Sequence, residues 1–473
     1  MSDYRVTIGL EIHAELKTRT KMFCACLNNP DEAAANKNIC PVCMAHPGTL
    51  PVVNKEAVHK VLLVGSALGG TLADFTEFDR KNYFYPDIPK GYQISQYKHP
   101  LIKGGMLHGV ALTRIHLEED TARSQHVGIK SLVDFNRAGV PLMELVTEPV
   151  IHSASDAGAF ARELQLLLRY VGAGEANMEK GEMRVEANIS IARSDLADSS
   201  KVGPLGTKVE VKNINSFRAV ERAIVFELER QEAVLEKGEK VVQETRGWDE
   251  EKQITFSQRK KESSHDYRYF PDPDLPKLML SEIPEFSLQS LKKELPELPW
   301  EKRARYTDSG IIPEHAEMFI QNETFGALFE QTVALLPLEQ KLIANYIGSD
   351  IAGLVSKNGE EGLKNITATG FASSIAAVSE GKISSRGVKD AIAEVFMRGG
   401  DLAEIHKKYL QQGDEGVLLT IAKKVVEANP QSAEDYKAGK EVALQFLVGQ
   451  GMRESKGSAN PQALRDAIQK VLR

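Results

Sequence analysis

The clearest pattern in the chain is a strict alternation of apolar and polar residues over residues 182–192. The apolar positions are Met183, Val185, Ala187, Ile189 and Ile191. A repeat of two residues predicts a β-strand whose apolar face lies against a core. The opposite face carries Arg184, Glu186, Asn188 and Ser190. On a single strand, such residues are typical of an ordinary solvated sheet face.

Three further stretches repeat this design and align charged residues on one face of a predicted strand. The aligned residues are Glu11, His13 and Glu15 in residues 9–16, Arg114, His116 and Glu118 in residues 113–120, and Lys208, Glu210 and Lys212 in residues 208–216. Four such strands indicate one sheet whose polar face is a reaction site. The alternative is a sheet crossed by structural salt bridges.

Other segments predict helices, loops and a change of organisation. Apolar residues at helical spacing predict helices at about 55–73, 155–171 and 217–236. Aromatic, cationic and amide side chains mixed with prolines predict loops that shape a pocket. These loop segments are residues 79–96, 136–149 and 266–274. From about Pro299 onward, the composition favours helices alone.

We therefore predict an α+β protein with three parts. The first part, residues 1–292, contains the sheet and its polar face. A helical domain follows in residues 293–408, and a helical tail in residues 409–473. The boundary between the helical domain and the helical tail is predicted from glycine-containing breaks at Gly399-Gly400 and at residues 412–414.

Length and composition are those of an ordinary globular protein. The 473 residues are 42% hydrophobic and contain no apolar run of 18 residues, so we expect no membrane-spanning helix. The start shows no signal-peptide pattern, and we expect a cytoplasmic protein. The net charge of −7 excludes bulk attraction of nucleic acid. Residues 437–473 carry seven Lys or Arg against three acidic residues and offer a local basic patch, although a solvated helical surface would look similar.

All four cysteines lie in one short segment as two closely spaced pairs, Cys24 with Cys26 and Cys40 with Cys43. Paired short spacings bring four thiolates within reach of one ion, which is typical of a structural Zn²⁺ site. Disulfides are not expected in a reducing compartment. The alternative is four reduced cysteines that hold no metal.

Several common catalytic motifs are absent, including the Walker loop, the Gly-x-Gly-x-x-Gly turn, His-Glu-x-x-His and the Gly-x-Ser-x-Gly elbow. Carboxylates and a histidine on sheet strands instead suit hard cations such as Mg²⁺. Arg and Lys on neighbouring strands would neutralise phosphoryl oxygens as charge develops. The residues alone therefore predict a metal-dependent phosphoryl-transfer site on an open sheet face.

Long runs along the chain carry a family resemblance. In the first part they are Gly9-Leu-Glu-Ile-His13, Asp79-Arg-Lys-Asn-Tyr-Phe-Tyr-Pro-Asp87, Tyr92-Gln-Ile-Ser-Gln96, His116-Leu-Glu-Glu-Asp120, Lys212-Asn-Ile-Asn-Ser-Phe217 and Asp266-Tyr-Arg-Tyr-Phe-Pro271. In the tail they are Phe446-Leu-Val-Gly449 and Lys456-Gly-Ser-Ala-Asn-Pro461. Over essentially the whole chain, the sequence resembles the B subunits of the aspartyl/glutamyl-tRNA amidotransferase family.

The resemblance implies a glutamine-synthetase-like, antiparallel-sheet cradle domain followed by all-helical C-terminal domains. It also implies a reaction that uses ATP and Mg²⁺. ATP phosphorylates the side-chain carboxylate of Glu misacylated onto tRNA(Gln), or of Asp on tRNA(Asn), and ammonia then displaces the phosphate. The implied partners are the amidase (A) subunit, which supplies ammonia through a tunnel, the small (C) subunit and the misacylated tRNA. The chain itself has no amidase Gly-Gly-Ser-Ser motif.

The resemblance also implies roles for individual residues. Metal and ATP-phosphate ligands are expected at Glu11, His13, Glu119, Glu179 and Glu186. Lys81 and Tyr83 are expected at the tunnel exit, near the reacting carboxylate. From their place on the polar faces we add Arg184, Asn188, Lys212 and Asn215 for phosphate and substrate positioning. The residues expected to be catalytic are Lys81, Tyr83, Glu119 and Arg184. The tail is expected to grip the outer corner of tRNA by its shape.

Two features depart from the family pattern. Glu186 stands where many relatives have Asp, and the cysteine quartet occurs in only some members, so the shared chemistry does not require zinc. Two other functions remain open. The extra helical domains count against a stand-alone ligase for a free amino acid, and the intact carboxylate set counts against a non-catalytic tRNA-binding or assembly protein. The residues do not decide between Glu-tRNA(Gln) and Asp-tRNA(Asn).

Overall fold

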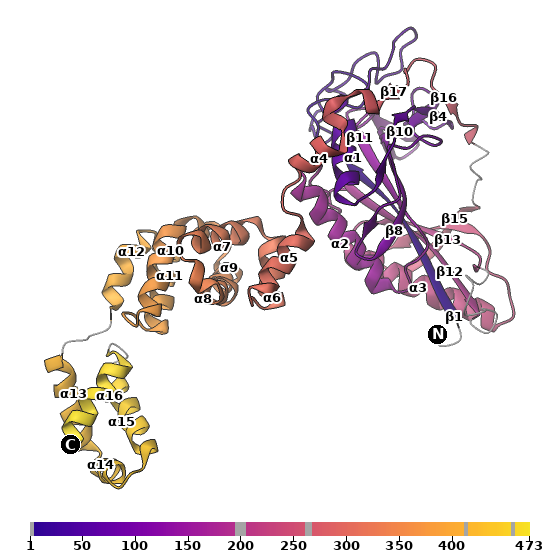
Figure 1. Cartoon of the computed structure of the whole chain (residues 1–473). Helices are drawn as coiled ribbons and strands as arrows, with labels where there is room; N and C mark the ends of the chain where they lie inside the picture. The colour runs from indigo at the N-terminus through magenta and orange to yellow at the C-terminus, as the bar shows by residue number, and fades with distance from the viewer. Residues whose placement is uncertain (1–3, 194–204, 261–266, 411–414, 456–458) are drawn as a thin grey trace. The chain divides into compact units, whose positions relative to one another are not determined.

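The structure is a computed structural model that describes residues 4–193, 205–260, 267–410, 415–455 and 459–473. The chain divides into two compact units, residues 1–299 and residues 300–473. The described strands all belong to the first unit, and the described elements of the second are helices (Figure 1). The predicted α+β class is therefore confirmed. The further division near residue 408 stays a prediction.

A ten-stranded, mostly antiparallel sheet forms the body of the first unit. Its central strand, β1 (Tyr4–Glu15), is antiparallel to β11 (Pro141–Thr147) on one side and to β12 (Met183–Arg193) on the other. Beyond β12 lie β13 (Val209–Ile214), β14 (Glu244–Asp249) and β15 (Ile254–Lys260), and beyond β11 lie β8 (Val110–Glu119), β6 (Ile102–Lys103) and β2 (Thr71–Leu72), with β7 (Met106–Leu107) paired to β8. The four strands predicted from their polar faces (β1, β8, β12 and β13) all belong to this sheet.

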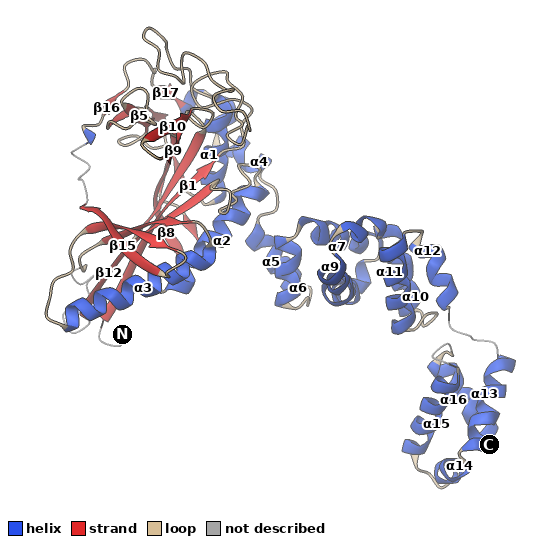
Figure 2. Ribbon diagram, turned by 180° about the vertical axis from the view of Figure 1, so that it is seen from behind, coloured by secondary structure: helices blue, strands red, loops and turns tan. Residues whose placement is uncertain are grey.

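Two helices cover one face of the sheet, α2 (Ala154–Tyr170) and α3 (Phe217–Glu236) (Figure 2). Each begins after a serine, Ser153 or Ser216, whose hydroxyl accepts a hydrogen bond from a backbone N–H of the first turn. Ile12 is completely buried, and such burial of an aliphatic side chain contributes about 1.5–3 kcal/mol to folding. With the apolar face covered by helices, the alternating polar residues lie together on the other face.

Strand β11 corrects the predicted loop over residues 136–149. Pro141 begins the strand, a position at which the missing backbone N–H is tolerated. Every residue of β11 except Val146 is buried. A central strand covered on both faces shows no polar alternation, so the pattern contained no strand signal here. As a consequence, Glu144 was not recognised as part of the polar face.

The other two segments predicted as pocket-forming loops, residues 79–96 and 266–274, contain short strands: β4 (Asp79–Asn82) pairs with β5 (Tyr92–Ser95) and β16 (Phe270–Pro271). Outside those segments, β3 (Phe75–Thr76) pairs with β17 (Leu278–Met279), and β9 (Arg123–Val127) pairs with β10 (Lys130–Asp134). Helix α1 (Lys55–Ala67) ends earlier than the predicted residue 73. It ends just before Gly69, whose φ of +67° favours glycine and is typical of a helix C-terminus. Helix α4 (Leu288–Glu294) lies near the end of this unit.

Helices follow from Pro299 onward, and none of the described helices has the length and apolar content needed to cross a membrane. They are α5 (Pro299–Asp308), α6 (Pro313–Gln321), α7 (Glu323–Leu335), α8 (Gln340–Asn345), α9 (Ala352–Asn358), α10 (Ala368–Ser379), α11 (Ser385–Arg398), α12 (Leu402–Ile405), α13 (Glu415–Ala428), α14 (Pro430–Lys437), α15 (Glu441–Glu454) and α16 (Pro461–Leu472). Residues Tyr346–Ile351 form a π-helical turn between α8 and α9. Helices α13 to α16 enclose an apolar core that includes Leu444, Leu447, Leu464 and Ile468.

A carboxylate on α7 should make part of the stability of the second unit depend on pH. Glu330 accepts hydrogen bonds of 2.6 Å from both Arg305 and the buried Tyr306. Burial alone would raise the pKa of Glu330, but these two hydrogen bonds outweigh it and lower that pKa. Because the pKa is depressed in the folded state, the stabilisation is present above the unfolded pKa and is lost as the pH falls through the folded value.

We therefore expect Glu330→Gln to lower the free energy of unfolding by about 1 kcal/mol near pH 7, a modest value because a third of the side chain is exposed. The difference from wild type should shrink as the pH falls toward about 4. Urea unfolding at both pH values measures this effect, with Glu360→Gln, an exposed carboxylate of the same unit, as the control. A difference that stays constant across this pH range would contradict the assignment.

Candidate active site

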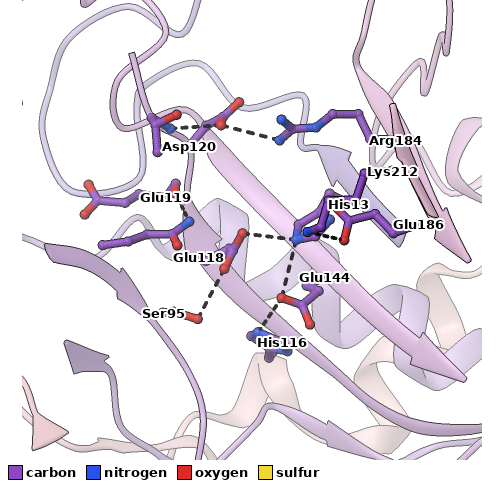
Figure 3. Close-up of polar contacts among 12 residues, drawn as sticks. His13, Ser95, His116, Glu118, Glu119, Asp120, Glu144, Arg184, Glu186 and Lys212 are labelled. Atoms are coloured by element: carbon purple, nitrogen blue, oxygen red, sulfur yellow. Dashed lines mark hydrogen bonds and ion pairs between the residues drawn. The ribbon is translucent and has the colours of Figure 1, made fainter. Parts of the chain in front are cut away.

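A row of four charged or polar side chains crosses the middle of the sheet. The strand register places His13 of β1 opposite Arg184 of β12 and opposite Glu144 of β11, and Glu144 opposite His116 of β8. Directly opposed residues of antiparallel strands share one face. His13 Nε2 lies 3.4 Å from Glu144 Oε2, and His116 Nε2 lies 3.3 Å from the same oxygen (Figure 3). Glu144 therefore bridges two histidines at the centre of the polar face.

Glu118 of β8 completes this central cluster and accepts contacts from two further elements. Its Oε1 lies 3.4 Å from His13 Nε2, and its Oε2 accepts a 3.3 Å hydrogen bond from Ser95 of β5. Both Glu118 and Glu144 are buried. The cluster thus gathers two carboxylates and two imidazoles from β1, β8 and β11 in a place with little water.

The neighbours of each group decide its protonation. Burial would raise the pKa of Glu144, but the charge and hydrogen bonds of His116 and His13 outweigh it and hold that pKa well below its usual value. The pKa of Glu118 is lowered in the same way by His13 and Lys81, against burial. Burial would lower the pKa of His13, but Glu118 and Glu144 raise it well above the usual value. Both carboxylates are therefore ionised at neutral pH.

A second group lies one step along the same face, around Glu11 of β1. The register places Glu11 opposite Glu186 of β12, and Lys212 Nζ of β13 lies 2.7 Å from Glu186 Oε2. Thr245 donates a 2.8 Å hydrogen bond to the buried Glu210 in the same region. Burial first, and then the charges of the nearby carboxylates, raise the pKa of Glu11 to about 7. This part of the face holds more carboxylates than cations, and a bound metal ion would reduce the repulsion between the carboxylates.

The donor sets on this face fit divalent cations. Three groups of side chains have ligand atoms within 4.8 Å of one another, and all three lie on the same face. They are Glu11 with His13 and Glu144, His116 with Glu118 and Glu144, and Glu11 with Glu186 and Glu210. Among the described residues, His116 Nδ1 and Asn188 Oδ1 are buried without a hydrogen-bond partner. Carboxylate oxygens with an imidazole are ligands for hard or borderline cations, so the residues present fit a bound Mg²⁺.

Cations line the end of the same face near the end of β1. Arg137 contacts Asp120 and lies 2.9 Å from Glu15 Oε1, and Arg184 lies 3.4 Å from Asp120 Oδ1. Burial raises the pKa of Glu15 to about 7, which Arg137 opposes. Arg184 keeps 41% of its side chain exposed. An anion that approaches this end of the face therefore meets a partly exposed guanidinium.

Most of the predicted site residues meet on this face. Glu11, His13, Arg184, Glu186, Asn188 and Lys212 lie on β1, β12 and β13 as predicted. Lys81 of β4 lies within electrostatic reach of Glu118 and Glu144, which raise its pKa against the effect of burial. Tyr83 follows β4, and its hydroxyl lies 3.5 Å from Gln93 Oε1.

Three of the predicted residues lie apart from this cluster. Glu119 follows Glu118 on β8 and therefore points to the other side, where its Oε1 lies 2.6 Å from Lys90 Nζ and accepts a hydrogen bond from Ile94 N. It faces a cavity of about 170 Å³ that Cys43 also lines. Glu179 is exposed in the turn before β12, and Asn215 is exposed just beyond β13. The roles of all three stay predictions.

Four residues of the metal-ligand groups were not among the predicted site residues: His116, Glu118, Glu144 and Glu210. The alternation placed His116, Glu118 and Glu210 on the polar face, but the family resemblance assigned the metal role to Glu119 instead of Glu118. Glu144 had no signal, because β11 is buried on both faces. The alternation of apolar and polar residues identified only strands that have one apolar and one polar face.

The four cysteines form a separate cluster near this region. Their sulfur atoms all lie within 4.8 Å of one another, and the four thiols are free. A hydrogen bond from Cys24 outweighs burial and lowers the pKa of Cys43 to about 5, and the charge of Lys21 also lowers it. Four sulfur atoms this close together, with the thiol of Cys43 deprotonated at neutral pH, fit the four ligands of a tetrahedral Zn²⁺ site.

A carboxylate-rich and histidine-rich face on a large antiparallel sheet, followed by a helical unit, is the arrangement of a catalytic domain with a helical extension. Comparison with known families agrees. The GatB/GatE catalytic domain family matches residues 6–283, and the GatB domain family matches residues 327–472. The chain belongs to the GatB/GatE family.

Curated relatives match along their full length. The chain is 42% identical to the B subunit of the aspartyl/glutamyl-tRNA(Asn/Gln) amidotransferase of Thermotoga maritima, over 99% of both chains. It is 41% identical to the protein of the same name from Thermus thermophilus and 43% identical to that from Herpetosiphon aurantiacus, again over 99% of each chain. The family expected from the sequence is therefore confirmed.

Proposed function

We propose that this chain is the component of a tRNA-dependent amidotransferase that activates and amidates an aminoacyl-tRNA. The substrate is Glu-tRNA(Gln), Asp-tRNA(Asn) or both, and the products are Gln-tRNA(Gln) and Asn-tRNA(Asn). The single observation that carries the proposal is the central cluster of the polar face, in which Glu144 is shared between two groups of possible metal ligands. Family membership and the names of the full-length relatives agree with it.

The reaction has two steps, and both need activation of a poor electrophile. A side-chain carboxylate oxygen attacks the γ-phosphorus of ATP, and ADP leaves. The nitrogen of ammonia then attacks the acyl carbon, phosphate leaves, and the nitrogen releases a proton. A carboxylate accepts a nucleophile poorly until one of its oxygens has become a leaving group, which is why ATP is consumed.

The polar face supplies charges of both signs for these steps. Two groups, Glu11 with His13 and Glu144, and His116 with Glu118 and Glu144, would hold Mg²⁺, which would neutralise charge on the phosphoryl oxygens. Lys212 and the partly exposed Arg184 orient anionic groups from the β12 and β13 side of the face. Lys81, close to Glu118, is positioned to orient the reacting carboxylate. Tyr83 is proposed to act beside Lys81, and Asn188 to assist phosphate binding. Glu119, Glu179 and Asn215 lie apart from the central cluster, and metal binding by Glu119 and Glu179 and substrate positioning by Asn215 stay predictions.

The remaining parts of the assembly follow from the same proposal. Ammonia comes from the amidase (A) subunit, and the small (C) subunit completes a heterotrimer in the cytoplasm. The helical tail, residues 409–473, binds tRNA through residues 437–473, in which seven Lys or Arg outnumber three acidic residues. The cysteine cluster holds a structural Zn²⁺ and takes no part in the chemistry.

ADP release tests the proposal directly. The chain is assembled with its partner subunits and supplied with Mg²⁺, ATP and ammonium, and three candidate acceptors are compared: misacylated Glu-tRNA(Gln), uncharged tRNA(Gln) and free glutamate. We expect ADP only with the misacylated tRNA, because the carboxylate must be delivered to the polar face by the bound RNA. Ammonium replaces the amidase, so the result does not depend on the tunnel.

Each other outcome favours a different function. Equal ADP formation with free glutamate would indicate a ligase for free amino acids. No ADP with any acceptor, while tRNA still binds, would indicate a tRNA-binding protein without catalysis. A parallel assay with Asp-tRNA(Asn) decides which of the two amidation reactions the enzyme performs.

A further inference from the structure

Five tyrosines from two separate segments of the chain form a continuous series of ring contacts, which we call the tyrosine ladder. Ring centroids lie 6.0 Å apart between Tyr85 and Tyr83, 5.9 Å between Tyr83 and Tyr267, and 6.1 Å between Tyr267 and Tyr269. Tyr269 and Tyr97 lie 4.4 Å apart. The β4, β5 and β16 region that carries the ladder lies at one end of the large sheet (Figure 2).

Two inner tyrosines of the ladder, Tyr267 and Tyr269, lie beside the candidate active site. Lys81 Nζ lies 5.1 Å from the centre of the Tyr267 ring, within the range of a cation–π interaction. Burial raises the pKa of Tyr269, which Lys81 opposes and the charges of Glu118 and Glu144 reinforce. Tyr269 is thus within electrostatic reach of the carboxylates of the central cluster.

The outer rung, Tyr97, has the geometry of a stacking platform. Its ring is nearly parallel to that of Tyr269, at 11°, while the other contacts in the ladder are edge-to-face. One face of Tyr97 is covered by Tyr269, yet 48% of the residue is exposed. Its exposure therefore falls on the opposite face and the ring edge. An exposed face on top of an existing stack is a surface on which another planar ring adds.

The surroundings of Tyr97 suit a nucleic acid strand. Lys98 follows it directly, Arg268 lies between Tyr267 and Tyr269 in the chain, and both cations are exposed. Proteins bind single-stranded nucleic acid by combining aromatic rings, on which bases stack, with cations that contact the backbone. Both ends of the ladder, Tyr85 and Tyr97, are exposed, which suits a strand that continues past the platform.

We infer that Tyr97 is the platform on which a base of the single-stranded 3′ end of the RNA substrate stacks, so that the aminoacyl group reaches Lys81 and the carboxylates beyond it. The inference rests on the proposed function and names the part of the protein that receives the end of the tRNA. The source of the stacked ring is the RNA. The adenine of ATP has the same stacking chemistry and is distinguished by the test.

The test compares two RNAs with one enzyme. Dissociation constants are measured, at one salt concentration, for intact uncharged tRNA(Gln) and for the same tRNA without its three 3′-terminal nucleotides, with the assembled enzyme. We expect the wild type to prefer the intact tRNA by about tenfold. Tyr97→Ala should lose this preference and bind both RNAs alike, and Tyr97→Phe should keep it, because a phenyl ring stacks equally well.

Phe84→Ala is the matched control, since Phe84 is an aromatic residue of the same region that is 88% exposed and is not one of the five rings of the ladder. It should leave the preference unchanged. A Tyr97→Ala enzyme that still prefers intact tRNA by tenfold, or a Phe84→Ala enzyme that loses the preference, overturns the inference. So does a Tyr97→Ala enzyme whose only change is a raised KM for ATP, which would assign the platform to adenine.

The RNA comparison also separates this inference from the proposed function. A wild-type enzyme that binds both RNAs equally well contradicts the platform but leaves the amidotransferase proposal intact. A wild-type enzyme that binds neither RNA contradicts both. Because the readout is a ratio of two affinities, general loss of tRNA binding through the tail does not imitate loss of the platform.

Discussion

Glu144→Gln is expected to lower ADP formation with misacylated tRNA by about a thousandfold or more, while the affinity for tRNA stays near the wild-type value. The carboxylate bridges His13 and His116 and belongs to two of the three groups that could hold a cation. The amide has the same shape but no charge. Loss of one anionic ligand removes several kcal/mol of charge stabilisation, and each step of about 1.4 kcal/mol corresponds to a factor of ten. Initial rates of ADP release at saturating tRNA measure the change.

The control is Glu148→Gln, because Glu148 follows β11 directly and accepts a 2.8 Å hydrogen bond from the hydroxyl of Thr113, away from the central cluster. This variant should keep nearly full activity. Since Glu144 is buried between two histidines, thermal melting must accompany the assay. A Glu144→Gln enzyme that melts like the wild type and retains more than about a tenth of its activity would remove Glu144 from the catalytic cluster.

Replacing Cys40 and Cys43 together by serine is expected to remove zinc from the protein, from about one ion per chain to almost none. The melting temperature of the first unit should fall by about 5 °C or more, because binding of a structural ion adds to the stability of the folded state. ADP formation should fall far less than in Glu144→Gln, since the cysteine cluster is separate from the carboxylate cluster. Metal analysis of the purified protein and calorimetry measure the two effects.

Thr49→Ala is the matched control in the cysteine segment, because Thr49 hydrogen-bonds the carbonyl of His46 and supplies no sulfur. It should retain zinc and melt within about 1 °C of the wild type. A cysteine double variant that has lost zinc but melts like the wild type would show that the ion contributes nothing to folding. Wild-type protein that binds no zinc would assign the four cysteines as free thiols.

The fold could be predicted from sequence where residues repeat with a clear period. The helix predicted at 217–236 has those bounds in the structure, and the one predicted at 155–171 lies at Ala154–Tyr170. Strand β12 was evident because one face meets a core and the other is polar. Strand β11 was missed for the opposite reason, since both of its faces are covered. Periodicity reports a difference between faces, and a fully buried strand has none.

The candidate site could be predicted from the sequence only in part, for the same reason. Side chains on alternating strands could be assigned to a shared face, and the structure brings Glu11, His13 and Glu186 together there. The alternation of residues 113–120 also placed Glu118 on that face, but the family resemblance assigned the metal role to the adjacent Glu119. In the structure Glu118 contacts His13, and Glu119 lies on the other side of β8 against Lys90. Which strands are neighbours, and in which register, is not contained in the alternation of any one strand.

The central position of β1 in the sheet has a consequence for folding during synthesis of the chain. Both of its partners come much later in the chain, β11 at Pro141–Thr147 and β12 at Met183–Arg193. At translation rates of about 5–20 residues per second, β1 waits roughly 10–35 s before β12 has been made. The apolar residues Ile8, Leu10 and Ile12 lie on a strand with two unpaired edges until β11 has been made, and with one unpaired edge until β12 follows. Such a strand is a target for chaperones that hold nascent chains, and for aggregation when they are scarce.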